Sequence, residues 1–192
     1  MPATFHSTPL PGVILVKPKI FCDDRGYFKE TYHQASYSEN GIPADFVQDN
    51  FSRSTRNTLR GLHFQYRKCQ AKLIQCLNGA IYDVAVDIRP FSPTYRRWYS
   101  AELTSENHHQ LFIPAGFAHG FCVISDNADL HYKCTNVYTP EYDTGIHWQS
   151  LDIPWPVETP ILSEKDAGLP LLDEADPIFT SFDELKQTQT HP

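Results

Sequence analysis

The sequence lacks the features that would place it in a membrane or an oxidising compartment. No run approaches the roughly 18 consecutive apolar residues that a membrane-spanning helix requires. No basic segment followed by an apolar stretch lies near Met1, so we expect no secretory signal. The five cysteines form an odd set without a Cys-x-x-Cys pair, which indicates reduced thiols rather than disulfides or a zinc site. We therefore expect a cytoplasmic protein that makes no membrane contact.

The chain also lacks an excess of positive charge. Its 23 acidic and 16 basic residues give a net charge of −7, which has the wrong sign for a general nucleic-acid binder. Residues 50–82, however, contain no acid at all. This segment carries six bases: Arg53, Arg56, Arg60, Arg67, Lys68 and Lys72. Such a segment suits a small anionic ligand, although a solvated face with acids from neighbouring segments explains it equally well.

Helical periodicity is also missing, whereas alternation with a period of two is present. Residues 81–89 place apolar side chains on one face and Asp83, Ala85 and Asp87 on the other. Asn78-Gly79 separates this strand from a strand at residues 72–77 and is typical of a hairpin. The other predicted strands cover residues 12–18, 27–32, 46–52, 60–65, 98–103, 110–113, 117–124 and 130–138.

Many short strands with turns between them predict an all-β protein, a β-sandwich or jelly roll with one or two short helices. We expect one helix at residues 33–40, ended by Gly41, and a second helical turn after Thr104. Residues 1–192 are predicted to form a single domain. Its C-terminal part, about residues 176–192, is predicted to be an acidic tail.

The segment Pro114-x-Gly116-x-x-His119 resembles the second motif of the cupin jelly roll, in which the histidine projects into the barrel. Metal cupins take further ligands from an earlier His-x-His and a glutamate. Here the corresponding segment contains only His63, and the next acid is Asp83. Two histidines are too few for a stable divalent-metal site, so we expect no metal.

Acid–base groups remain once a metal is set aside. His63 is the natural proton acceptor because imidazole titrates near neutral pH. A lysine such as Lys72 inside a barrel is costly unless it meets an anion. Tyr132 shares one predicted strand face with Cys134, Asn136 and Tyr138. A structural role stays open for each of the three residues. His63 could be a hydrogen-bonded core histidine, Lys72 a solvated lysine on an edge strand, and Tyr132 part of an aromatic core.

The relative direction of the Arg60 and His63 side chains depends on Gly61. In a regular strand Arg60 and His63 would point to opposite faces. Either Gly61 marks a bulge, or one of the two side chains leaves the cavity.

Six segments closely resemble one family, the dTDP-4-dehydrorhamnose 3,5-epimerases, and they follow its order over roughly residues 12–173. They are DDRGYFKETY (23–32), FVQDNFSRS (46–54), LRGLHFQ (59–65), GAIYDVAVDIR (79–89), IPAGFAHGF (113–121) and LSEKD (162–166). The resemblance implies a metal-free cupin jelly roll, a homodimer and no cofactor. The implied reaction inverts C3 and C5 of dTDP-4-dehydro-6-deoxy-D-glucose through enolates, which makes dTDP-4-dehydro-L-rhamnose.

The resemblance also implies residue roles. His63 would remove the proton beside the ketone, with Asp166 as its carboxylate partner. Lys72 would stabilise the enolate oxygen, and Tyr132 would return a proton from the opposite face. Substrate binding would involve nine further residues. Arg25 and Arg60 would hold the diphosphate, Gln48, Asn50 and Glu30 the nucleotide or sugar, and Phe21, Tyr138, His119 and Lys165 would line or border the pocket. In the family the segment with Arg25 and Glu30 reaches the partner subunit's site.

Three alternatives are left open. Relatives that epimerise only C3 or C5, or that isomerise related nucleotide-linked keto sugars, keep the same motifs. A metal cupin would use His63 and His119 as iron ligands, and a sugar or nucleotide binder would not catalyse at all. Ala71 replaces the usual glycine before the lysine, and residues 146–155 are shorter than is usual in the family.

Overall fold

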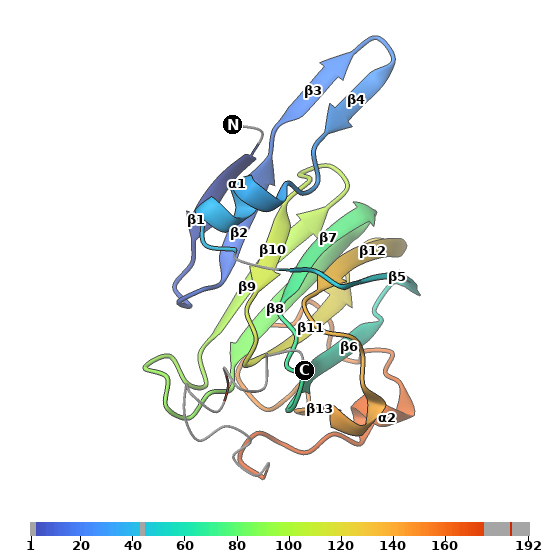
Figure 1. The fold of residues 1–192 in the computed structure, drawn as a ribbon. Helices are drawn as coiled ribbons and strands as arrows, with labels where there is room; N and C mark the ends of the chain where they lie inside the picture. Colours follow the sequence, from blue (N-terminus) through green and yellow to red (C-terminus); the bar gives the residue numbers. More distant parts are fainter. Residues whose placement is uncertain (1–2, 43–44, 175–184, 186–192) are drawn as a thin grey trace.

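The computed structural model describes residues 3–42, 45–174 and 185, and two antiparallel β-sheets form its body (Figure 1). The six-stranded sheet has the order β1 (Ala3–Ser7), β2 (Ile14–Pro18), β10 (Gln110–Ile113), β7 (Lys72–Asn78), β12 (Asn127–Cys134) and β5 (Gln48–Thr55). The five-stranded sheet has the order β13 (Asp143–Gly145), β6 (Leu59–Gln65), β11 (Phe117–Val123), β8 (Ala80–Asp87) and β9 (Trp98–Thr104). The predicted all-β class is confirmed.

The remaining elements are small. A two-stranded hairpin of β3 (Ile20–Asp23) and β4 (Gly26–Lys29) projects beyond the two sheets (Figure 1). The helices in the described residues are α1 (Gln34–Glu39), the 3-10 turn η1 (Pro140–Tyr142) and α2 (Glu164–Ala167). The helix predicted at residues 33–40 is confirmed: His33 caps its first turn through the Ser36 amide, and Asn40 ends it. The helical turn predicted after Thr104 is present as one isolated turn, in which the His108 amide donates to the Thr104 carbonyl at 3.1 Å. The Thr104 hydroxyl also accepts hydrogen bonds from the Glu106 and Asn107 amides.

A hydrophobic core fills much of the space between the sheets. Ile74 of β7, Leu130 of β12, Phe117 of β11 and Ala85 of β8 belong to one buried cluster. Val84 on the other side of β8 belongs to a second cluster that covers the outer face of the five-stranded sheet. Both faces of β8 are therefore buried, and the polar face predicted for this strand points into the protein rather than to solvent.

Two other expectations for the strands are wrong. Asn78-Gly79 does not close a hairpin, because β7 pairs with β10 and β12 while β8 pairs with β11 and β9. The chain crosses there from one sheet to the other, and Gly79 takes the left-handed φ of 77° at the corner. The predicted strand at residues 130–138 ends at Cys134, so Asn136 and Tyr138 lie beyond it.

The sequence patterns missed β1, β3 and β13, which are three to five residues long. The predicted acidic tail lies outside the described residues, apart from Leu185, which packs into the outer cluster. In the described part of the chain, no helix has the length and apolar character needed to cross a membrane.

Candidate active site

A bulge in β6 puts two basic side chains on the same inner face of the five-stranded sheet. His63 lies opposite His119, and Arg60 lies opposite Phe121, so three steps along β6 match two steps along β11. This register shift confirms that Gly61 marks a bulge. A Cβ on Gly61, whose φ is 113°, would stand 2.5 Å from the Cα of Gly120, so only glycine fits between the strands.

His63 is held by the carboxylate that the resemblance assigned to it. Its Nε2 lies 2.5 Å from Oδ1 of Asp166, which is 3% exposed at the start of α2. Ser163 caps this short helix through the Asp166 amide. Burial alone would raise the pKa of Asp166, but its hydrogen bonds with His63, the Gly61 amide and Ser163 hold that pKa below the usual value. An ionised carboxylate only accepts hydrogen bonds, so Nε2 carries the proton and Nδ1 is left as the acceptor.

Lys72 and Tyr132 face this space from the opposite sheet. Lys72 begins β7 directly opposite Cys134 of β12, and Tyr132 lies two residues before that cysteine on the same inner face. Burial lowers the pKa of Lys72, and the groups that oppose this shift include Asp143 and Asp83. Burial raises the pKa of Tyr132, so its hydroxyl keeps its proton over a wide pH range.

His119 lies deeper than a residue that only borders a pocket. It is 8% exposed, and its Nε2 is 2.8 Å from Oδ1 of Asp83 on the neighbouring strand β8. Burial lowers the pKa of His119, and the charges of Lys72 and His63 act in the same direction. His119 is therefore a neutral imidazole at neutral pH.

Strand β5 connects to the same space through a line of hydrogen bonds. The side-chain amide of Asn50 donates to Cys134 Sγ at 3.5 Å, and the side-chain amide of Gln48 donates to Asn50 Oδ1 at 2.9 Å. Gln48 Oε1 accepts from the Tyr138 amide at 2.8 Å. Gln48 and Asn50, two of the three residues predicted to bind the nucleotide or sugar, thus form one continuous network with the strand that carries Tyr132.

Asp143 of β13 joins two further predicted residues. Its Oδ2 accepts a hydrogen bond from the Tyr138 hydroxyl at 3.0 Å and forms an ion pair with the Lys165 ammonium. The bond to Asp143 raises the pKa of Tyr138. Arg60 is exposed at the rim, where its Nε donates to the Ser54 hydroxyl at 3.0 Å. Arg60, Tyr138 and Lys165 are thus exposed, whereas Asp166 and His119 are buried.

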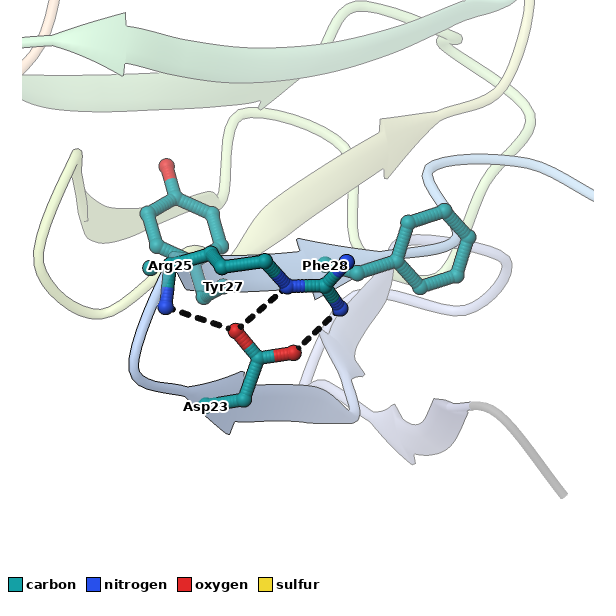
Figure 2. A pocket seen from close by; sticks show the side chains of 5 residues that line it. Asp23, Arg25, Tyr27 and Phe28 are labelled. Atoms are coloured by element: carbon teal, nitrogen blue, oxygen red, sulfur yellow. Dashed lines mark hydrogen bonds and ion pairs between the residues drawn. The ribbon is translucent and has the colours of Figure 1, made fainter.

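Arg25, Phe21 and Glu30 are not brought to this site within one chain. Arg25 lies at the tip of the β3–β4 hairpin, where it forms a two-pronged ion pair with Asp23, at 3.2 Å from Nε and 2.6 Å from Nη2 (Figure 2). Phe21, on the same hairpin, is 46% exposed. Glu30 follows the hairpin close to Tyr37, and its buried Oε1 has no hydrogen-bond partner among the described residues.

Sequence reasoning did not include Asp83 and Asp143 among the site residues. Asp83 had a signal, because an acid within an otherwise apolar β-strand requires a partner when it is buried. Asp143 had none, since its strand spans only three residues. Across the described ranges, no three or more His, Cys, Asp or Glu side chains gather in a way that could hold a metal ion.

A histidine paired with a carboxylate, a half-buried lysine and a protonated tyrosine supply a base, a cation and an acid. Fold and site together define an acid–base enzyme on a cupin-like β fold. A model of the dTDP-4-dehydrorhamnose 3,5-epimerase family matches residues 7–174. The chain belongs to this family, which confirms the resemblance found in its sequence.

Individual relatives agree with this assignment. The dTDP-4-dehydrorhamnose 3,5-epimerase of Methanothermobacter thermautotrophicus is 48% identical over 180 residues, covering 91% of this chain and 97% of that protein. A dTDP-4-dehydrorhamnose 3-epimerase of Streptomyces niveus is 39% identical over 170 residues, covering 86% of this chain and 82% of that one. The crystal structure of the 3,5-epimerase RmlC from Legionella pneumophila, in complex with dTDP-4-keto-L-rhamnose, aligns with a TM-score of 0.88 and 46% identity, covering 91% and 95% of the two chains.

Proposed function

We propose that this chain inverts C3 and C5 of dTDP-4-dehydro-6-deoxy-D-glucose and so produces dTDP-4-dehydro-L-rhamnose. The observation that carries the proposal is the pairing of His63, on the five-stranded sheet, with buried Asp166 of α2, while Lys72 and Tyr132 face them from the six-stranded sheet. Double epimerases among the relatives, one of them bound to dTDP-4-keto-L-rhamnose, support this substrate class.

The base in this proposal is Nδ1 of His63. C3 and C5 both neighbour the C4 ketone, so removing a proton from either carbon leaves an enolate. Asp166 holds the ring through Nε2 and stabilises the imidazolium that forms when Nδ1 takes up the proton. Lys72 places a positive charge beside the oxygen on which negative charge develops, which lowers the barrier to the enolate.

Tyr132 is the proposed acid that completes the inversion. It belongs to the six-stranded sheet, whereas His63 belongs to the five-stranded sheet, so the two groups approach the sugar from opposite walls. Because its pKa is raised by burial, Tyr132 holds a proton that it can deliver to the enolate carbon. Removal on one face and delivery on the other inverts the carbon, and no oxidation or reduction takes place.

The first prediction concerns deuterium uptake in D2O. We expect the wild-type protein, given dTDP-4-dehydro-6-deoxy-D-glucose, to incorporate deuterium at both C3 and C5. Tyr132→Phe is expected to slow inversion more than it slows exchange, because the base on the other face is intact. NMR and mass spectrometry of the reduced product measure both quantities. Uptake at one carbon would indicate a mono-epimerase instead, and equal loss of exchange and inversion in the variant would refute the role of Tyr132.

We further propose that the chain works as a homodimer in which the β3–β4 hairpin completes the partner's site. Three observations support this: the hairpin projects from the body, Phe21 is exposed, and among the described residues Arg25 forms an ion pair only with Asp23 of the same hairpin (Figures 1 and 2). In this arrangement Arg25 binds the diphosphate together with Arg60, and Glu30 contacts the nucleotide or sugar. Tyr138 and Phe21 line the base and sugar pocket.

Mixing two inactive variants tests the shared site. Arg25→Ala and His63→Asn chains, refolded together in equal amounts, form half of their dimers as mixed pairs. If Arg25 serves the partner, each mixed pair has one intact site, and we expect about a quarter of wild-type activity. If Arg25 serves its own chain, every site carries one defect and no activity returns. Sedimentation equilibrium of the wild-type protein checks that dimers form.

We also propose a cytoplasmic location. The nucleotide-sugar chemistry and the cysteines support it, since Cys69, Cys76, Cys122 and Cys134 are buried free thiols and Cys22 is an exposed one.

A further inference from the structure

Two histidines lie side by side on the inner face of the five-stranded sheet, and each contacts a carboxylate. His119 and His63 lie directly opposite each other on adjacent strands. Each imidazole uses its Nε2 to contact a buried carboxylate, which is Asp83 for His119 and Asp166 for His63. The site therefore contains two histidine–carboxylate pairs, and only the pair with Asp166 has a role in the proposed mechanism.

Asp83 has an unusual environment for a buried acid. It is 0% exposed, and its Oδ1 accepts from His119 at 2.8 Å. Its Oδ2 is also buried but has no hydrogen-bond partner among the described residues. A buried carboxylate oxygen without a partner is costly, so such an atom in a native protein requires an explanation.

A second acid on the same strand provides the contrast. Asp87 is equally buried and points to the same inner side of β8. Its two oxygens accept four side-chain hydrogen bonds of 2.6–2.8 Å. Two come from Nε and Nη2 of Arg89, and the others come from the Ser92 and Thr94 hydroxyls. A carboxylate with a purely structural role is satisfied in this way, and Asp83 is not.

The charge of Asp83 acts on the two groups that face the sugar. It opposes the effect of burial on the pKa of Lys72 and on the pKa of His119. Its hydrogen bond also selects the tautomer of His119, because Nε2 must carry the proton and Nδ1 must not. His119 then presents an acceptor nitrogen, and it remains uncharged beside His63 when His63 becomes an imidazolium.

We propose that Asp83 is a positioning residue of the epimerase, which fixes His119 in its Nε2–H tautomer. This inference rests on the proposed function. Asp83 acts through His119 and transfers no proton itself.

Asp83→Asn tests the proposal, because it removes the charge but keeps the size and one acceptor oxygen. We expect kcat to fall about ten- to a hundredfold, as it does when a residue that orients an imidazole is changed. Binding of dTDP should stay within about twofold, since Asp83 is remote from the nucleotide in this proposal. Asp87→Asn is the matched control: it should lower Tm while leaving kcat within about twofold of the wild type.

A second measurement does not depend on activity, and its wild-type part does not depend on the variant's folding. ¹⁵N NMR of the histidine rings in the wild-type protein should show His119 as the neutral Nε2–H tautomer, and Asp83→Asn should shift it towards a mixture. A wild-type His119 with its proton on Nδ1 would overturn the proposal, as would a kcat for Asp83→Asn no lower than that of Asp87→Asn. If the wild-type protein takes up no deuterium from D2O, the proposed function fails, whereas the tautomer result still reports on Asp83.

Discussion

Replacing His63 with asparagine is expected to reduce kcat by about 10²–10⁴-fold, the contribution usual for a general base. Asparagine keeps a donor for the buried Asp166, so the fold should remain intact. It cannot accept a proton from carbon, however, so deuterium exchange at C3 and C5 should be lost together with turnover. Binding of dTDP should persist, because the nucleotide contacts proposed here lie on other residues.

Two variants sharpen this experiment. Asp166→Asn removes the charge behind the imidazole and should lose most of the turnover, because the pKa of Asp166 lies below its usual value and the group is ionised at neutral pH. His131→Asn is the matched control, since His131 lies on β12 and contacts Gln75 and Asp49 rather than the site. Wild-type turnover in His63→Asn would show that the proton acceptor is a different group.

Replacing Lys72 with glutamine is expected to cost about 10²–10³-fold in kcat, as the loss of one preorganised group facing a developing oxyanion does. The reason is electrostatic: the charge on the C4 oxygen appears within a partly buried site, where water screens it poorly. Inversions at C3 and C5 use the same oxygen, so both exchange rates should fall by a similar factor. KM should change less than kcat, because the charge develops only in the transition state.

Lys133→Gln provides the comparison for Lys72. Lys133 is next to Cys134 on β12, and its ammonium pairs with Asp49 at 2.9 Å. This variant removes a positive charge from a residue next to Tyr132 in the sequence, but the ammonium contacts Asp49 and not the site. We therefore expect kcat to be unchanged. Exchange at C3 and C5 at the wild-type rate in Lys72→Gln would mean that the enolate is stabilised by another group, for example Arg60.

Much of the fold could be predicted from local patterns. The alternation at residues 81–89 coincides with β8 up to Asp87, and the apolar segment at residues 110–113 coincides with β10. Each pattern reflects the geometry of a single strand, in which neighbouring side chains point to opposite sides. Pairing could not be inferred in this way: Asn78-Gly79 has the residues of a hairpin turn, yet β7 and β8 belong to different sheets.

For the site, the motifs specify which chemical groups are available and the family to which the chain belongs. His63, Lys72 and Tyr132 could be named without coordinates. The three-dimensional arrangement was needed to see that the Gly61 bulge turns Arg60 and His63 to one side, and that Asp83 contacts His119. Asp83 and His119 are separated by 36 residues, and His63 and Asp166 by 103. Contacts over such separations depend on how strands align and pack, which no local sequence pattern specifies.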